Sequence, residues 1–187
     1  MKAIMISINP KWVAKILNGE KTLEIRKTCP ALYSPYDPID VYIYCTKDRP
    51  YLTRGVRGDV YPSCVSSQGI VPHHLNGKVV AKFTLNKVEE IKNFACFYNT
   101  KNISSTQLET LSCLTFEELN NYLKGKIGYI WHIDNLVIFD KPKELSEFKY
   151  YKKFSEIDYM LPIPRKETCE RLVALTRAPQ SWQFIEI

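Results

Sequence analysis

Short runs in which apolar and polar residues alternate recur along the chain and constrain its fold more than any other feature. Alternation of this kind is the pattern of a β-strand with one buried face. It occurs in residues 2–8, 20–27, 41–45, 77–88, 129–133, 136–140 and 181–187. Pro142 is expected to end the sixth of these strands. Long alternation of strands with helices is missing, so the pattern favours a small mixed barrel over βαβ units.

Three segments have helical spacing instead. They are residues 11–18, 106–111 and 115–123. Asn9 and Pro10 are a strong start signal for the first helix, because Asn is a good N-cap and Pro suits the first helical position. Gly19 is its natural end. Thr115 and Glu118 have the spacing of a capping box at the start of the third, and the polar residues 92–105 are expected to form a loop or a short helix.

The remaining length lies in two stretches that do not follow the strand pattern. Residues 47–75 and 145–176 are rich in charged residues and prolines, and we expect them to be insertions. The prediction is therefore a single α+β domain over residues 1–187: a small mixed β-barrel with flanking helices and two insertions. The insertions are also candidate contacts for a protein partner, so a protein-interaction module is one of the functional alternatives. The oligomeric state is left open.

The cysteine spacing and the lengths of the apolar runs limit the cellular compartment in which we expect the chain. No run approaches the ~20 apolar residues that a membrane-spanning helix needs, and the N-terminal apolar run lacks the cleavage site of a signal peptide. We expect a cytoplasmic protein with no membrane partner. The six cysteines are widely and irregularly spaced, which predicts reduced thiols. The best metal set, Cys64 with His73 and His74, contains adjacent histidines that point different ways, so no metal and no cofactor are predicted.

Positive charge is concentrated in the first third of the chain. The chain has a formal net charge of +6, and residues 1–60 hold 10 Lys and Arg against 6 Asp and Glu. An excess of this size permits nucleic-acid binding and is equally compatible with general solubility.

The first third also contains the pattern Gly19-x-Lys21-x-x-Glu24-x-Arg26. On a strand, Glu24 and Arg26 share one face about 6–7 Å apart, with Lys21 at the preceding corner. In a cleft, two cations and one acceptor suit a ligand with phosphate and base-edge donors. On an open surface, the same pattern is a salt-bridged, solvated strand face. The candidate ligand-binding residues are Ser7, Lys21, Glu24, Arg26 and Lys27.

This pattern, placed just after a helix that opens at Pro10, resembles the signature of the ASCH family of PUA-like barrels. Further segments resemble phage- and prophage-type members, namely residues 7–12, 128–133, 136–142 and 177–182. The resemblance covers about residues 1–46, 77–91, 115–145 and 177–187 and does not extend to the insertions. It implies a β-barrel with a cleft between barrel and first helix, and RNA or a modified nucleotide as the partner.

The resemblance also implies an enzymatic alternative. One branch of the family hydrolyses N4-acetylcytidine with a Lys, a Thr and a Glu. Lys21 matches the Lys, but Glu24 stands at the Thr position, where a carboxylate favours the charged form of Lys21 over a neutral nucleophile. The remote Glu has three candidates, Glu89, Glu90 and Glu109. A hydrolase of N4-acylated cytidine, or a ribonuclease, with Lys21 and Glu24 as catalytic residues is therefore the alternative to a binding module.

Aromatic residues are a second feature of RNA-binding proteins, which use them to stack on bases. Trp12, Trp131 and Trp182 lie in helix or strand patterns, and we expect all three in the core. His132 has no carboxylate partner nearby in the sequence, which makes it a weak acid–base candidate.

Overall fold

The structure of the protein is a computed structural model that describes residues 2–30, 37–47, 65–66, 69–70, 75–94, 97–100, 102–158 and 165–187. The helices are α1 (Pro10–Leu17), α2 (Ser105–Ser112) and α3 (Phe116–Leu123), with a short 3-10 helix η2 (Leu145–Glu147). The strands are β1 (Lys2–Ile8), β2 (Leu23–Arg26), β3 (Ile39–Cys45), β4 (Val65–Ser66), β5 (Gly69–Ile70), β6 (Val79–Leu85), β7 (Val88–Phe94), β8 (Phe97–Asn99), β9 (Gly128–His132), β10 (Asp134–Lys143), β11 (Lys149–Asp158), β12 (Arg165–Ala174) and β13 (Trp182–Glu186).

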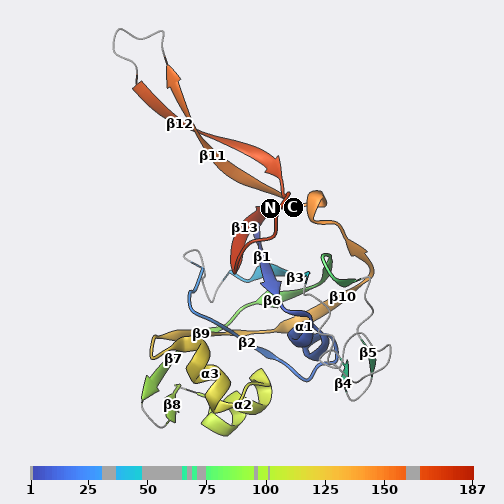
Figure 1. Cartoon of the computed structure of the whole chain (residues 1–187), viewed down its shortest axis with the longest axis vertical. Helices are drawn as coiled ribbons and strands as arrows, with labels where there is room; N and C mark the ends of the chain where they lie inside the picture. The colour runs from blue at the N-terminus through green and yellow to red at the C-terminus, as the bar shows by residue number, and fades with distance from the viewer. Residues whose placement is uncertain are drawn as a thin grey trace, which may run out of the picture.

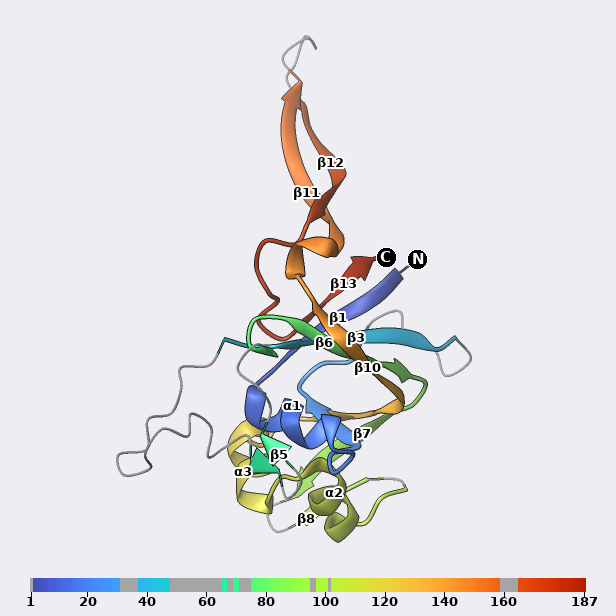
Figure 2. The same ribbon diagram turned by 90° about the vertical axis from the view of Figure 1, so that its right-hand side faces the viewer.

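Two sheets organise the body of the molecule (Figures 1 and 2). The larger has seven strands in the order β10-β6-β3-β1-β13-β11-β12, and the smaller has four in the order β2-β9-β7-β8. Strand β1 pairs in parallel with β3 and antiparallel with β13. The predicted α+β class is confirmed. Within the described residues the two sheets stay open and share a core, rather than forming one continuous barrel sheet.

The main core lies where these sheets and α1 meet. Strand β1 contributes Ile4, Ile6 and Ile8 from one face, as its alternation predicts. Helix α1 buries Val13 and Ile16 against them. The other buried members include Val41, Ile43, Phe83, Leu85 and Trp131.

A second apolar cluster holds β2 from its other side. Leu23 and Ile25 pack with Leu108 of α2, Leu119 of α3 and Ile130 of β9. Because successive side chains of a strand point to opposite faces, this packing turns Glu24 and Arg26 toward the side on which α1 lies. The strand that carries the charged pattern is therefore fixed between two apolar layers.

Local signals place the helices as the sequence predicts. The Asn9 side chain accepts a hydrogen bond from the Lys11 amide at the start of α1. Thr115 and Glu118 form the expected capping box of α3, and Ser104 with Gln107 forms a second one at α2. None of the helices in the described part of the chain has the length and apolar character of a membrane span.

The strand predicted over residues 77–88 is wrong in one respect, because it is divided between the two sheets. Strand β6 ends at Leu85 and β7 begins at Val88, and the break carries neither Gly nor Pro that would mark it in the sequence. The expectation of a loop or helix over residues 92–105 is also wrong in part, because β7 and β8 extend into this stretch.

Residues 145–176, predicted as an insertion, contain a long hairpin. Strands β11 and β12 pair in register from Lys149 with Ala174 to Asp158 with Arg165. The hairpin forms one edge of the larger sheet and projects beyond the rest of the molecule (Figures 1 and 2). Strand β10 continues past Pro142, contrary to the prediction; as an edge strand it tolerates a residue without an amide donor. Most of the other predicted insertion, 47–75, lies outside the described residues.

The core position of β1 generates a stability prediction. Ile6 is fully buried, whereas Ile138 on β10 is 50% exposed. Replacing Ile6 by Ala should lower the free energy of unfolding by about 2–5 kcal/mol, because a cavity replaces buried methylene contacts. The matched change Ile138→Ala should cost well under half of this. Urea unfolding followed by circular dichroism measures both, and equal losses would show that the core is placed wrongly.

Candidate functional site

A short corner connects α1 to the charged strand. Gly19 takes a left-handed conformation with φ of 75°, which a residue without a Cβ adopts at no steric cost. The amides of Glu20 and Lys21 both donate to the Lys15 carbonyl. The Thr22 amide then donates to Leu111 of α2. Backbone hydrogen bonds thus set the position from which Lys21 and β2 begin.

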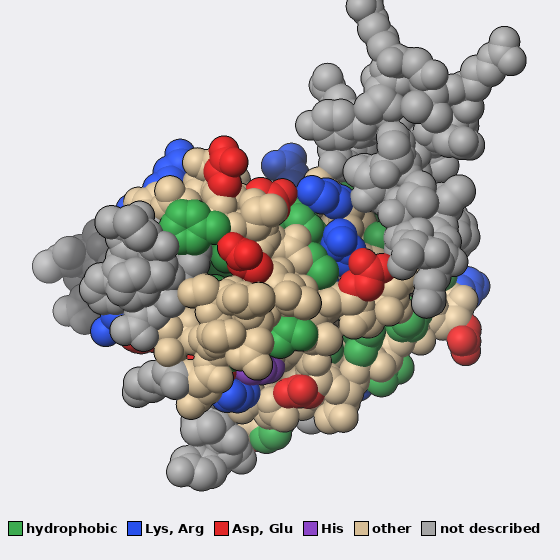
Figure 3. All heavy atoms as spheres, turned by 90° about the horizontal axis from the view of Figure 1, so that it is seen from below, with side chains coloured by type: hydrophobic (Ala, Val, Ile, Leu, Met, Phe, Trp, Pro, Cys, Tyr) green, Lys and Arg blue, Asp and Glu red, His purple; other side chains and the backbone are tan. Residues whose placement is uncertain are grey.

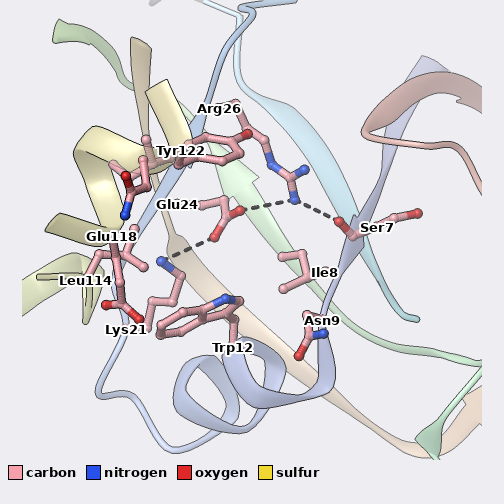
Figure 4. A pocket seen from close by; sticks show the side chains of 12 residues that line it. Ser7, Ile8, Asn9, Trp12, Lys21, Glu24, Arg26, Leu114, Glu118 and Tyr122 are labelled. Carbon is pink, nitrogen blue, oxygen red and sulfur yellow. Dashed lines mark hydrogen bonds and ion pairs between the residues drawn. The ribbon is translucent and has the colours of Figure 1, made fainter. Parts of the chain in front are cut away.

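Lys21, Glu24 and Arg26 form a buried ionic trio (Figure 4). Glu24 lies in the middle: one carboxylate oxygen is 3.3 Å from Lys21 Nζ, and the other is 3.0 Å from Arg26 Nη2. The three side chains are only 2%, 9% and 9% exposed, in the order Lys21, Glu24, Arg26. The interpretation of this pattern as a solvated strand face is therefore wrong, and the cleft interpretation fits the burial.

The Lys21 amino group has an acceptor for each of its donors. Besides Glu24, its Nζ donates to the carbonyl of Leu23 at 2.8 Å and to that of Ser112, at the end of α2, at 2.7 Å. Two backbone carbonyls and one carboxylate thus surround the Lys21 amino group and fix its position at the base of the site.

Arg26 connects β2 to the seven-stranded sheet. Its Nη2 donates to the Ser7 carbonyl at 2.8 Å, and its Nη1 donates to the Ser181 hydroxyl at 3.3 Å. The Ser7 hydroxyl donates in turn to the Pro179 carbonyl at 2.6 Å. Arg26 Nε is buried with no hydrogen-bond partner among the described residues. The guanidinium thus joins β2 to the end of β1 and to the loop before β13.

A pocket of about 410 Å³ opens above the trio. This volume falls within the range of small-molecule sites. Trp12 of α1 borders it near Lys21, and Tyr122 of α3 borders it near Arg26 (Figure 4). The full lining consists of Ser7, Ile8, Asn9, Trp12, Lys21, Glu24, Ile25, Arg26, Leu114, Glu118, Asn121 and Tyr122.

Both aromatic side chains of the pocket have a lysine over the ring. Lys11 Nζ lies 4.3 Å from the Trp12 ring centroid, and Lys27 Nζ lies 4.7 Å from that of Tyr122. Burial is the main reason that the pKa of Tyr122 is raised above 10.0, with Glu24 adding to the effect and Arg26 opposing it. Tyr122 therefore remains a neutral phenol that can donate a hydrogen bond.

Four of the five predicted binding residues line the pocket, namely Ser7, Lys21, Glu24 and Arg26. Lys27 is exposed beside it, over Tyr122.

The residues missed from the sequence come mainly from α3, where Glu118, Asn121 and Tyr122 follow helical spacing along one face. This row of polar side chains on one face of the predicted helix was the sequence signal that could have placed α3 at the site. Trp131 is in the core as predicted, and Trp182 packs partly buried against it. The prediction that Trp12 lies in the core is only partly right, because Trp12 packs against the core and also lines the pocket.

A separate buried carboxylate lies away from the pocket lining. Glu89 accepts hydrogen bonds from Asn102 at 2.8 Å and pairs with Lys87 at 2.7 Å and with His132 Nε2 at 2.9 Å. His132 thus has a carboxylate partner from a neighbouring strand, which its sequence surroundings did not reveal. Neither Glu89 nor the other two candidates for a remote glutamate line the pocket, whereas Glu118 does.

The structure describes only some of the residues on which the prediction of no metal site was based. Cys64, His73 and His74 lie outside the described residues. Within the described ranges, no group of three or more His, Cys, Asp or Glu side chains is arranged to hold a metal ion. The face seen along the long axis carries acidic and basic side chains interspersed with apolar ones (Figure 3). This face therefore carries no broad patch of one sign among the residues that the structure describes.

Comparisons with known proteins find similar solved structures but no similar sequence. The sequence matches no protein-family model and no curated protein. The chain is similar to an ASCH crystal structure from Zymomonas mobilis, with a TM-score of 0.48 and 15% identity over 76% of this chain and 73% of that chain. A mutant of the Z. mobilis protein gives a TM-score of 0.45 and 16% identity over 76% of this chain and 74% of its own. A second mutant gives 0.45 and 15% over 78% and 77%.

The ionic trio generates a stability prediction. Glu24→Gln leaves Lys21 and Arg26 buried without their shared carboxylate, and removing one partner from a buried ion pair costs about 3–5 kcal/mol. The exposed pair of Lys153 and Glu170, 3.5 Å apart, supplies the control, because Glu170→Gln should cost less than about 1 kcal/mol. Urea unfolding measures the free energy of unfolding of both variants. Similar small decreases for the two would mean that Glu24 does not hold the trio together.

Glu89 generates a prediction of pH dependence. Burial raises the pKa of its carboxyl, but hydrogen bonds from Lys87, Asn102 and His132 together outweigh burial, and the pKa is lowered from 4.5. A carboxyl with a depressed pKa stabilises the fold above its unfolded pKa and loses this contribution as the pH falls through its folded value.

We therefore expect the wild-type free energy of unfolding to drop below about pH 4.5 and that of Glu89→Gln to drop less. Urea titrations at pH 7 and at about pH 3.5 measure the difference. Identical pH profiles for the two proteins would contradict the assignment.

Proposed function

We propose that this protein binds RNA and holds one unpaired nucleotide base in the pocket between Trp12 and Tyr122. The observation that carries the proposal is the combination of two aromatic borders with a buried ionic floor in a volume of about 410 Å³. Aromatic side chains stack on unpaired bases, and hydrogen bonds to base edges then select among them.

The floor offers one acceptor flanked by donors. Each carboxylate oxygen of Glu24 has one charged partner, and a carboxylate has about four lone-pair sites in all. Glu24 can therefore accept a hydrogen bond from an exocyclic amine and keep both ion pairs. The trio of two cations and one anion has a net charge of +1. Lys27 adds positive charge beside Tyr122, whereas Lys11 beside Trp12 is paired with the pocket carboxylate Glu118. This arrangement suits an anionic backbone at the mouth and a base inside.

The contacts favour binding over catalysis. Lys21, the candidate nucleophile, gives its donors to three acceptors. The pocket carboxylate Glu118 accepts from the Thr115 amide and lies 3.5 Å from Lys11, and its pKa is lowered chiefly by that amide. These contacts keep Glu118 ionised, so this carboxyl does not serve as a proton donor at neutral pH.

The test removes one aromatic border. Tyr122→Ala should raise the Kd for a fluorescent single-stranded RNA roughly 5- to 150-fold, because stacking of one base on an aromatic side chain contributes about 1–3 kcal/mol. Tyr122→Phe should retain most of the affinity. Tyr151→Ala, on an exposed hairpin tyrosine, is the matched control and should bind as the wild type does. Fluorescence anisotropy measures all four proteins.

Two results would overturn the proposal. Equal affinity for Tyr122→Ala and Tyr151→Ala would remove the pocket from the RNA interface. Acetate release from N4-acetylcytidine, or cleavage of a mixed RNA pool, that is lost in Lys21→Met would replace binding by catalysis.

A further inference from the structure

A second hollow lies where the projecting hairpin joins the seven-stranded sheet. Its volume is about 460 Å³. The residues that line it come from β11, from the segment after β12 and from β13: Tyr150, Lys152, Thr176, Arg177, Ala178 and Gln183. Three of the six belong to residues 145–176, the predicted insertion that the sequence analysis offered only as a candidate contact for a protein partner.

The lining of this hollow has the chemistry of an anion site. Lys152 and Arg177 are cations, and Tyr150, Thr176 and Gln183 add neutral side-chain donors. None of the six lining residues in the described chain carries a carboxylate. Arg offers a planar fork and Lys a point charge, the two groups that proteins use most for phosphate.

Strand alternation directs charge into the hollow. Lys152 and Tyr150 are two residues apart on β11 and share a face, whereas Lys153 points to the other face, where it lies 3.5 Å from Glu170. Lys152 therefore lies on the face of β11 that lines the hollow, and Lys153 lies on the other face.

The loop that borders this hollow also contacts two residues that line the first pocket. Residues 175–181 run from β12 to β13, between the hairpin base and the region of α1 and β2 (Figures 1 and 2). Arg177 and Ala178 line the second hollow. Pro179 and Ser181 make the hydrogen bonds to Ser7 and Arg26 at the first. The three residue steps from Ala178 to Ser181 span at most about 10 Å, so one short loop connects the second hollow to side chains that line the first.

We propose that this second hollow binds a phosphodiester group of the RNA strand whose base occupies the aromatic pocket. The identity of the anion as RNA rests on the proposed function, whereas the preference for an anion rests on the hollow itself. Lys152 and Arg177 hold the phosphate, and Tyr150, Thr176 and Gln183 supply further donors. Contacts of this kind position a strand and increase affinity without reading its sequence.

The experiment compares two double variants of the full chain. Lys152→Gln/Arg177→Gln removes the two cations of the hollow, and Lys149→Gln/Lys153→Gln removes two from the opposite face of β11, so both variants lose the same charge. Anisotropy with a single-stranded RNA of about ten nucleotides is recorded over a range of salt concentrations. The first variant should lose about tenfold in affinity, and its slope of log K against log salt should fall by about 0.7, the value for one phosphate of a single strand. The second should lose less than about twofold.

A mononucleoside separates this inference from the proposed function, because it has no phosphate. Its affinity should fall in Tyr122→Ala and stay unchanged in Lys152→Gln/Arg177→Gln. Equal RNA affinities and salt slopes for the two double variants would overturn the phosphate site and leave the base pocket standing. RNA binding that is weakened by Lys152→Gln/Arg177→Gln but unaffected by Tyr122→Ala would keep the phosphate site and overturn the base pocket.

Discussion

One carboxylate, that of Glu24, makes the charged centre of this molecule possible. Two cations that share a buried site repel one another, and each loses hydration. Glu24 lies between them and contacts both, so the site carries alternating charges instead of two like ones. Through Lys21 this centre reaches the end of α2, and through Arg26 it reaches β1 and the loop before β13. Three separate parts of the chain are therefore joined through the ionic trio that Glu24 holds together.

The surroundings of β2 explain why the ionic centre can also serve as a pocket floor. β2 is the edge strand of the smaller sheet, yet all four of its residues are buried. Apolar packing of Leu23 and Ile25 on one side leaves the other side of the strand to polar groups. An edge strand that is covered in this way is protected from pairing with another chain, and its polar face lies at the bottom of a hollow rather than on an open surface.

Local patterns predicted the parts of the site that depend on local structure. Asn9 and Pro10 placed α1, and alternation placed Glu24 and Arg26 on one face of a strand. The contributions of Tyr122 and Glu118 required the packing of α3 against β2, which no local pattern specifies. The contact of His132 with Glu89 joins neighbouring strands in the same way.

Two errors in the fold prediction have a similar origin. The break between β6 and β7 has no glycine or proline to mark it, because the chain changes sheets there without a tight turn that requires one. The β11–β12 hairpin was not recognised because charged residues occupy so many of its positions. Residues 151–153 and 170–172 of this hairpin are exposed, and its sequence lacks the alternation by which the other strands were found.

The position of β13 has a consequence for the order of assembly. This strand is not at an edge but lies between β1 and β11 in the larger sheet, and the hydroxyl that accepts from Arg26 belongs to a residue 155 positions further along the chain. Closing so long a loop is entropically costly and slow compared with local contacts. During synthesis, the first helix and its charged strand leave the ribosome long before the segment that completes their surroundings. The nascent chain must therefore keep Arg26 hydrated until β13 docks, and the surroundings of Arg26 are complete only when the sheet is complete.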